Sequence, residues 1–378
     1  MKDIVNPFPV SGYHGKELFC NRDAEAEKLI SNINNGIHTS LLSIRRMGKT
    51  GLIYHVFDLL KSKKKINCIY ADIYATQSLR DFTNQLGSAI MKTFPEQKSI
   101  GKKFMQFIKG LKPVISFDTL TNQPQLSFDY SQPKQYEQSL EGIFSFLEKQ
   151  NTTIVIAIDE FQQITSYPEK NMEALLRTLI QPLKNVRFIF SGSSKHLLHD
   201  IFSNSKRPFF ASTQPLYLGA IEGDKYISFI EKKFIEHKRK INNEALLFII
   251  EWSRRHTYYT QALCNCIFAT GIKNIKIEEV HTAINNLLEE HEHIFFQYRQ
   301  LLTTMQWDLL KAIAIEEKLY KPSSKKFISK HNVGTPSNIQ RTLEALLNKE
   351  MIFKDHDNGG AFYSVYDCFL SRWFEHKY

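Results

Sequence analysis

Eight residues near the start of the chain, Ser43-Ile-Arg-Arg-Met-Gly-Lys-Thr50, place a glycine, a lysine and a threonine where they could bind phosphate. They follow an apolar run and lead into a helical pattern, and a tight loop between a strand and a helix is the setting that a phosphate-binding loop needs. Gly48 lets the backbone approach a phosphate closely. Lys49 would reach the β- and γ-phosphates of a nucleotide, and Thr50 would ligate Mg²⁺.

This phosphate loop departs from the usual pattern at one position, because Ser43 stands where that pattern begins with glycine. The alternative interpretation is a surface turn in which Arg45, Arg46 and Lys49 are ordinary solvated cations. The nucleotide-binding interpretation assigns contacts with the nucleotide to the residues that follow in the loop, which are Arg46, Met47, Gly48, Lys49, Thr50 and Gly51.

A pair of carboxylates follows the most apolar strand pattern in the chain. Residues 153–158 are predicted to form a buried strand, and Asp159 and Glu160 come directly after it. In open α/β sheets, ligands bind at the carboxyl ends of the strands. Asp159 is predicted to hold Mg²⁺, directly or through water, together with Thr50, and Glu160 to polarise the water that attacks the γ-phosphate. A solvated acidic turn is the alternative, but the phosphate loop earlier in the chain favours a joint nucleotide site.

Two further polar positions are candidates for catalysis. A strand predicted at 186–191 ends in hydroxyl groups, and Ser191 or Ser193 could reach the γ-phosphate or the attacking water. A hydroxyl-rich turn that caps the next helix is the alternative. Arg207 could act as a charge-stabilising finger on the nucleotide of a neighbouring subunit. A solvated loop arginine is the alternative for that residue.

The length and composition indicate a folded protein with more than one domain. The chain has 378 residues, so two or three domains are expected. It has no apolar run of the roughly 20 residues needed to span a bilayer, and its first residues have no apolar signal core. Five scattered cysteines lack metal-site spacing and fit a reducing compartment. We therefore expect a cytoplasmic protein with no membrane partner.

The net charge permits a polyanionic partner without requiring one. Lysine and arginine exceed the acidic residues by 10, and a positive surface attracts polyanions. Part of the excess would surround a nucleotide, and the rest is spread over residues 61–65, 102–112 and 321–330. A solubilising surface is the alternative explanation for these basic runs.

Hydrophobic periodicity divides the chain into three parts. Over residues 1–218, strands alternate with helices, which predicts the open, mostly parallel αβα sheet of a P-loop NTPase with a hairpin excursion at about 113–130. Residues 219–300 are helix after helix without a clear strand. Residues 301–378 combine short helices with two short strands that are joined at 355–360, which is a winged-helix pattern.

The segment 334–347 has the features of a recognition helix. Its apolar residues recur at helical spacing, and Asn338, Gln340 and Arg341 would then face outward, where such side chains can read base edges. Winged helices also dock proteins, so double-stranded DNA and a protein partner both remain open. The lysines that could contact phosphates are Lys325, Lys326, Lys330 and Lys349.

These motifs together resemble the STAND branch of the AAA+ ATPases, and more closely its archaeal-ATPase-like group. The resemblance covers nearly the whole chain, and it rests on the phosphate loop, the acidic pair, Asn6-Pro-Phe, Phe19-Cys-Asn-Arg22 and Ser191-Gly-Ser-Ser194. It implies an ATPase core, an all-helical lid and a winged helix. It also implies that Arg22 lies near the adenine and that Ser193 or Ser191 is the sensor of the γ-phosphate.

The lid of this family often carries a Gly-x-Pro-Tyr-type turn that touches the nucleotide. Here Arg255 and Thr257 stand in the places of the glycine and the proline. His256 and Tyr258 could still approach the nucleotide.

Two classes of function fit these features. One is an ATP-hydrolysing switch whose lid and winged helix move with the nucleotide state, and Glu160 favours it. The other is a nucleotide-stabilised interaction module that hydrolyses little, which Ser43 and the altered lid turn favour. Both bind ATP or ADP with Mg²⁺, and both leave a homo-oligomer open.

Overall fold

The computed structural model describes residues 6–61, 66–94, 99–130 and 132–378, and these form two compact units. The core unit consists of the described residues within 13–43 and 48–219. The C-terminal unit consists of residues 6–12, 44–47 and 220–378. Residues 1–5 of the predicted core and 62–65 of one predicted basic run lie outside the described residues. The predicted domain boundaries remain predictions.

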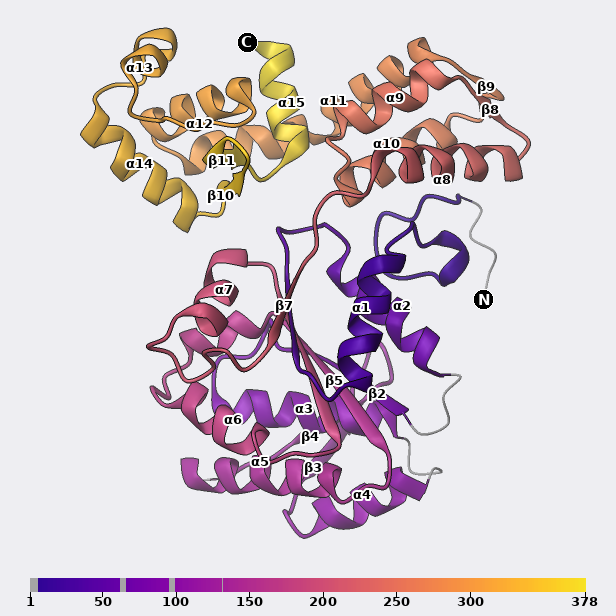
Figure 1. Ribbon diagram of the computed structural model, residues 1–378, viewed down its shortest axis with the longest axis vertical. Helices are drawn as coiled ribbons and strands as arrows, with labels where there is room; N and C mark the ends of the chain where they lie inside the picture. Colours follow the sequence, from indigo (N-terminus) through magenta and orange to yellow (C-terminus); the bar gives the residue numbers. More distant parts are fainter. Residues whose placement is uncertain (1–5, 62–65, 95–98, 131) are drawn as a thin grey trace. The chain divides into compact units, whose positions relative to one another are not determined.

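A five-stranded parallel sheet forms the centre of the core unit (Figure 1). Its strands are β1 (Thr39–Leu42), β2 (Ile66–Asp72), β5 (Thr153–Asp159), β6 (Val186–Gly192) and β7 (Gln214–Tyr217). Their order is β2-β5-β6-β1-β7, and every neighbouring pair runs parallel. The predicted open parallel sheet is therefore confirmed. It brings the strand before the phosphate loop and the strand before the acidic pair to the two sides of β6.

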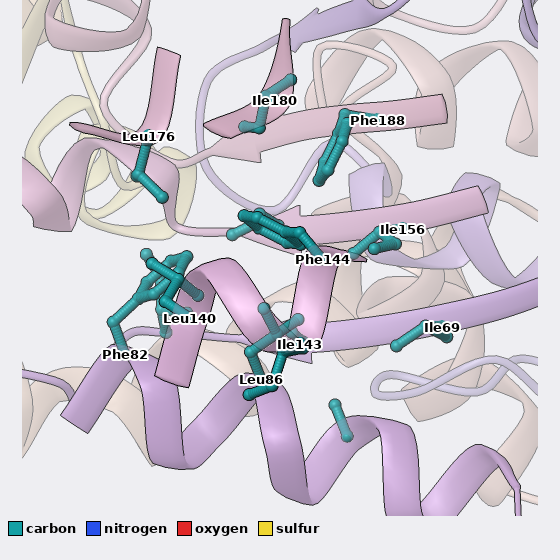
Figure 2. Packing of buried hydrophobic residues seen from close by; sticks show 14 of the residues in the cluster. Ile69, Phe82, Leu86, Leu140, Ile143, Phe144, Ile156, Leu176, Ile180 and Phe188 are labelled. Atoms are coloured by element: carbon teal, nitrogen blue, oxygen red, sulfur yellow. The ribbon is translucent and has the colours of Figure 1, made fainter. Parts of the chain in front are cut away.

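Helices surround the sheet, which explains why its central strand β5 is mostly apolar. Residues 154–159 of β5 are all buried. In the core, the Phe144 ring meets Phe188 of β6 edge-on, with ring centroids 5.9 Å apart (Figure 2). The helices of the core unit are α1 (Asp23–Asn34), α2 (Lys49–Lys61), α3 (Leu79–Thr93), α4 (Ser99–Lys109), α5 (Pro133–Glu148), α6 (Met172–Ile180) and α7 (Lys195–Ser203), with short 3-10 turns η1 (Lys16–Leu18) and η2 (Phe161–Ser166).

The predicted hairpin excursion is present as β3 (Val114–Phe117) and β4 (Pro124–Ser127), which pair antiparallel. Leu126 is 2% exposed and packs on Gly87 of α3. A Cβ atom at position 87 would lie 2.3 Å from Leu126 Cδ2, so only glycine allows this close approach.

A partly buried histidine precedes β1. His38 Nδ1 accepts a hydrogen bond from the backbone N–H of Phe188 at 3.1 Å. Burial, and then the positive charges of Arg187 and Arg177, lower the pKa of His38 to about 4. The ring is therefore neutral at physiological pH.

The lid part of the C-terminal unit is built from helices, as predicted, with one addition. A short parallel pair, β8 (Lys240–Ile241) and β9 (Asn274–Ile275), joins its loops. Two-residue strands are too short to produce an alternating pattern in the sequence. The helices of this part are α8 (Gly223–Glu236), α9 (Asn243–Trp252), α10 (Thr257–Ala269) and α11 (Ile277–Leu301).

The last part of the chain has the predicted order of helices and a two-stranded wing. In its third helix Ile339 and Leu343 are fully buried, whereas Asn338, Gln340 and Arg341 are exposed as predicted. Across the described residues, we find no helix with both the length and the apolar character to cross a membrane. The elements are α12 (Thr304–Glu316), α13 (Lys325–His331), α14 (Pro336–Asn348), β10 (Ile352–Asp357), β11 (Gly360–Val365) and α15 (Cys368–Lys377).

Candidate nucleotide-binding site

The Asp159 carboxylate connects the phosphate loop with the end of the sheet. This side chain is 5% exposed and accepts hydrogen bonds from three hydroxyl groups of three different elements. Those groups are Thr50 Oγ1 at 2.9 Å and Tyr70 Oη at 2.7 Å on Oδ2, and Ser191 Oγ at 2.6 Å on Oδ1. The backbone N–H of Glu160 also donates to Oδ1, at 3.1 Å. The start of α2 and the ends of β5 and β6 therefore converge on this carboxylate.

Lys49 begins α2 and is 6% exposed. Its Nζ lies 3.4 Å from the carbonyl oxygen of Ser43. Gly48 has a φ of +92°, a conformation that favours glycine. The backbone N–H groups in the first turn of a helix lack partners within the helix and suit an anion. The lysine and this helix start therefore offer positive charge at one place.

The Glu160 carboxylate is held by two neighbours. Its Oε2 accepts hydrogen bonds from Gln162 Nε2 at 2.6 Å, from Ser193 Oγ at 2.7 Å and from Ser193 N at 3.0 Å. Glu160 itself has a φ of +58°. Glu160, which is predicted to polarise the attacking water, therefore contacts Ser193, which is predicted to reach the γ-phosphate or that water.

Gln162 fits this arrangement only because residue 192 is glycine. A Cβ atom there would lie 1.9 Å from Gln162 Oε1. That oxygen is buried and has no hydrogen-bond partner among the described residues. An unpaired buried acceptor costs about 1–3 kcal/mol, so the contact with Glu160 carries an energetic cost.

The two arginines predicted near the nucleotide are both engaged within the core unit. Arg22 is 3% exposed and donates to the carbonyl oxygen of Gly219 at 2.8 Å. Arg207 donates from Nε to Glu173 Oε2 at 3.1 Å and also pairs with Asp200. The adenine contact of Arg22 and the finger role of Arg207 remain predictions.

The remaining loop residues divide between the two units. Gly51 belongs to the core unit, and a Cβ atom there would lie 3.4 Å from the ring of Phe19. Arg46 and Met47 belong to the C-terminal unit. There the Arg46 guanidinium lies 4.5 Å from the centroid of the Tyr258 ring, and Met47 is 4% exposed.

Two family models match the chain. One, described as an ATPase domain predominantly from Archaea, matches residues 19–244. The chain belongs to this archaeal ATPase family. The other model, described as a probable winged helix domain, matches residues 293–376 and agrees with the fold described above. No curated protein matches the chain.

Three solved structures of archaeal proteins share the fold of this chain. The Walker-type ATPase of Pyrococcus abyssi has a TM-score of 0.67 and 18% identity, with 98% of this chain and 99% of that chain covered. The ORC2 protein of Aeropyrum pernix, in ADPNP–ADP complexes, has a TM-score of 0.58 and 13% identity over 98% of both chains. The ORC1 protein of the same organism, in complex with DNA, has a TM-score of 0.53 and 12% identity over 99% of this chain and 97% of that one. This member of the archaeal ATPase family therefore shares its fold with these three proteins.

Two residues of the candidate site, Tyr70 and Gln162, are not predicted by the sequence. Burial together with the negative charge of Asp159 raises the pKa of the Tyr70 hydroxyl well above the usual value. The strand pairing of Asp72 with Asp159 places Tyr70 two residues before this edge. Gln162 lies only two residues after Glu160, and no sequence pattern of its own marks it as a site residue. The register between β2 and β5 could have identified Tyr70, but the sequence does not reveal that register.

Proposed function

We propose that this protein binds ATP or ADP with Mg²⁺ at the carboxyl ends of β1 and β5 and hydrolyses ATP. The observation that carries the proposal is the Asp159 carboxylate, which accepts hydrogen bonds from Thr50 and from Ser191 at 2.9 and 2.6 Å. Membership of the archaeal ATPase family supports it. The ADPNP–ADP complexes of the Aeropyrum pernix ORC2 protein also agree with a nucleotide site in this fold.

Each side chain of the site has a role in this proposal. Lys49 would neutralise charge on the β- and γ-phosphates. Glu160 would accept a hydrogen bond from the attacking water and draw a proton from it as the bond to phosphorus forms. Ser193, or Ser191 two residues before it, would donate to an oxygen of the γ-phosphate. Because Ser193 already contacts Glu160 at 2.7 Å, the two groups occupy one small region.

The side chains at the start of α2 and the end of β5 suit Mg²⁺. Thr50 and Asp159 are both hard oxygen donors, and their oxygens are 2.9 Å apart. Mg²⁺ in such enzymes is held by one or two protein oxygens together with substrate phosphates and water. Within the part of the chain that the structure describes, no group of three or more His, Cys, Asp or Glu side chains is placed to hold a metal. Thr50 and Asp159 would hold the ion, which when bound would reduce the charge on the phosphate oxygens.

Phosphate release from ATP tests the hydrolytic part of the proposal. We expect Glu160→Gln to lower the rate by about 10²-fold or more, the usual contribution of a general base. Glu141→Gln is the matched control, because Glu141 is exposed on α5. Equal rates in wild type and Glu160→Gln would exclude hydrolysis at this site.

Nucleotide binding itself is tested at the phosphate loop. Lys49→Ala should abolish measurable binding of ADP, whereas Lys102→Ala on the exposed side of α4 should bind like wild type. Calorimetry measures the binding of ADP directly, so the result does not depend on whether the protein hydrolyses ATP. Unchanged affinity in Lys49→Ala would remove the site assignment.

A second function, a nucleotide-stabilised interaction module with little turnover, is favoured by one observation. The Glu160 carboxylate is bound by Gln162 and Ser193, so the general base is occupied by protein donors. In that case ADP and ATP should raise the unfolding temperature of wild type and Glu160→Gln equally, by mass action. Phosphate release would then not exceed the rate of the Lys49→Ala variant.

We further propose that the winged helix binds double-stranded DNA, with a protein partner as the alternative. Asn338, Gln340 and Arg341 are exposed on α14, and Lys325 and Lys326 are exposed on α13. The DNA complex of the Aeropyrum pernix ORC1 protein, which shares this fold, agrees with such a role.

Salt-dependent retardation of a duplex tests the DNA proposal. Because each phosphate contact releases a counterion, Lys325→Ala and Lys326→Ala should each reduce the salt slope by about one. Lys273→Ala, exposed in the lid, is the matched control. If no shift occurs at low ionic strength, DNA is excluded and a protein partner remains.

A further inference from the structure

Three consecutive residues of the lid turn (residues 253–258) bind three consecutive carbonyl groups of the phosphate loop. All of them belong to the C-terminal unit. The contacts are His256 Nε2 with the Arg45 oxygen at 3.0 Å, the Thr257 hydroxyl with the Met47 oxygen at 3.0 Å and the Tyr258 backbone N–H with the Arg46 oxygen at 3.2 Å. The lid turn therefore contacts the main chain of the loop.

These contacts also complete the start of α10. The residue before this helix, His256, makes no side-chain hydrogen bond to the first turn of the helix. The N–H of Tyr258 is one of the groups that a helix start leaves without an internal partner. The carbonyl of Arg46 accepts it. The phosphate loop and the helix thus satisfy each other's polar groups.

The side chain of Arg46 strengthens the same attachment. Its guanidinium lies 4.5 Å from the centroid of the Tyr258 ring and 6.0 Å from that of Tyr259. Such cation–π contacts are worth about 0.5–2 kcal/mol. The backbone of Arg46 has a φ of +63°, which is unfavourable for a residue with a side chain. The lid turn therefore holds a loop residue in a conformation that it would not adopt readily by itself.

The lid turn is itself held in a fixed shape. Arg254 and Arg255 have φ values of +54° and +55°, and strained residues persist only where their surroundings determine them. The buried hydroxyl of Ser253 is bonded to the hydroxyl of Thr260 at 2.7 Å. Arg254 Nη2 donates to Ser371 Oγ at 3.0 Å on α15. The groups of His256, Thr257 and Tyr258 that form hydrogen bonds with the loop are therefore held in fixed positions.

Because the peptide bond is planar, the hydrogen bonds to the loop carbonyls also fix the direction of the loop N–H groups. In a trans peptide unit, the C=O and the N–H of the next residue point in opposite directions. Since the carbonyls of residues 45–47 point to the lid turn, the N–H groups of residues 46–48 point away from it. Successive N–H groups that are turned to one side form a site for phosphate oxygens.

We propose that His256, Thr257 and Tyr258 are positioning residues that orient the peptide groups of the phosphate loop for the phosphates of a nucleotide. The inference rests on the proposed nucleotide site, and it assigns these residues to the main chain of the loop instead of to direct contact with the nucleotide. It also provides a direct route by which the nucleotide state reaches the lid, because the loop that binds phosphate is bonded to the start of α10.

Hydrogen–deuterium exchange of the full chain without nucleotide tests the attachment directly. Thr257→Val removes one hydroxyl at nearly constant volume. Loss of one hydrogen bond should raise amide exchange in residues 44–50 by about 2- to 10-fold. Thr270→Val is the matched control, because the Thr270 hydroxyl bonds to Ile267 at the other end of α10.

ADP affinity, measured by calorimetry, supplies the second readout. Thr257→Val should weaken ADP binding by about 2- to 10-fold, and a double variant with His256→Phe should weaken it further, while Thr270→Val should not. Exchange and affinity that match wild type in both variants would overturn the inference, as would equal loosening of α10 by Thr257→Val and Thr270→Val. If wild type binds no ADP, the proposed function fails, whereas the exchange measurement still decides whether the lid turn holds the loop.

Discussion

Tyr70→Phe removes one hydroxyl from the centre of the candidate site and leaves the packing of β2 intact. The hydroxyl donates to Asp159 Oδ2 at 2.7 Å, and the ring packs on Tyr54 with centroids 4.8 Å apart. The ring contact survives in phenylalanine. The raised pKa of Tyr70 keeps the hydroxyl protonated at ordinary pH, so the effect should not depend on pH between neutral and mildly alkaline conditions.

The size of the effect follows from the donors that remain. A hydrogen bond to a charged group contributes about 1.5–3 kcal/mol. In the variant, Asp159 keeps its hydrogen bonds to Thr50, Ser191 and the N–H of Glu160. The free energy of unfolding should therefore decrease by an amount at the lower end of this range, about 1.5 kcal/mol. For a unit of this size, that corresponds to a decrease of about 3–6 °C in unfolding temperature. Because Oδ2 also accepts from Thr50, Mg²⁺-dependent ADP binding should weaken as well.

Thermal unfolding with and without ADP and Mg²⁺ measures both effects. Tyr74→Phe is the matched control, because Tyr74 lies four residues further along and is 66% exposed. If Tyr70→Phe and Tyr74→Phe unfold at the same temperature and bind ADP equally, Tyr70 does not support Asp159 and the reasoning is refuted.

Three further predictions concern stability, each measured by the free energy of unfolding. His38 has a folded pKa of about 4, below its unfolded value, so the unfolded chain binds more protons between about pH 6.5 and 4. Stability should therefore fall by roughly 2–3 kcal/mol as the pH drops through this window, and His38→Asn should flatten the decrease; an unchanged pH profile would contradict this. Gly192→Ala should cost about 1–3 kcal/mol by overpacking against Gln162, whereas Gln162→Ala should be nearly neutral because it removes a bond and an unpaired acceptor together. The double variant should recover most of the loss, and additive costs would show that the two residues do not collide. Arg207→Ala should cost about 1 kcal/mol through its partly exposed ion pair with Glu173; loss of turnover without loss of stability would instead favour the predicted finger role.

The parts of the site that the sequence predicted share a local signature. Gly48, Lys49 and Thr50 are consecutive, and Asp159 ends an uninterrupted apolar run. Such patterns can be recognised in the sequence without knowledge of the fold. A strand that is buried on both faces must be apolar, and a phosphate loop must be compact. The same logic identified the hairpin and the winged helix, whose turns and alternation are local.

The parts that the sequence did not predict depend on which strands are neighbours. Tyr70 reaches Asp159 only because β2 pairs with β5 in one particular register. The edge strand β7 is half exposed and contains Pro215, so it lacks the apolar run that identified the central strands. Gln162 meets Glu160 across a turn that requires Gly192 on another strand. These features are properties of the assembled sheet.

The structure gives a physical reason why serine is acceptable at the first position of the phosphate loop. Ser43 is not among the residues with positive φ, so its backbone conformation does not require glycine. It is 2% exposed, and it offers its carbonyl oxygen to Lys49, a group that every residue possesses. The unfavourable conformation falls on Arg46 instead, at a φ of +63°, where the N–H and the ring of Tyr258 hold it. The lid turn therefore holds Arg46 in a conformation that a glycine would adopt more readily.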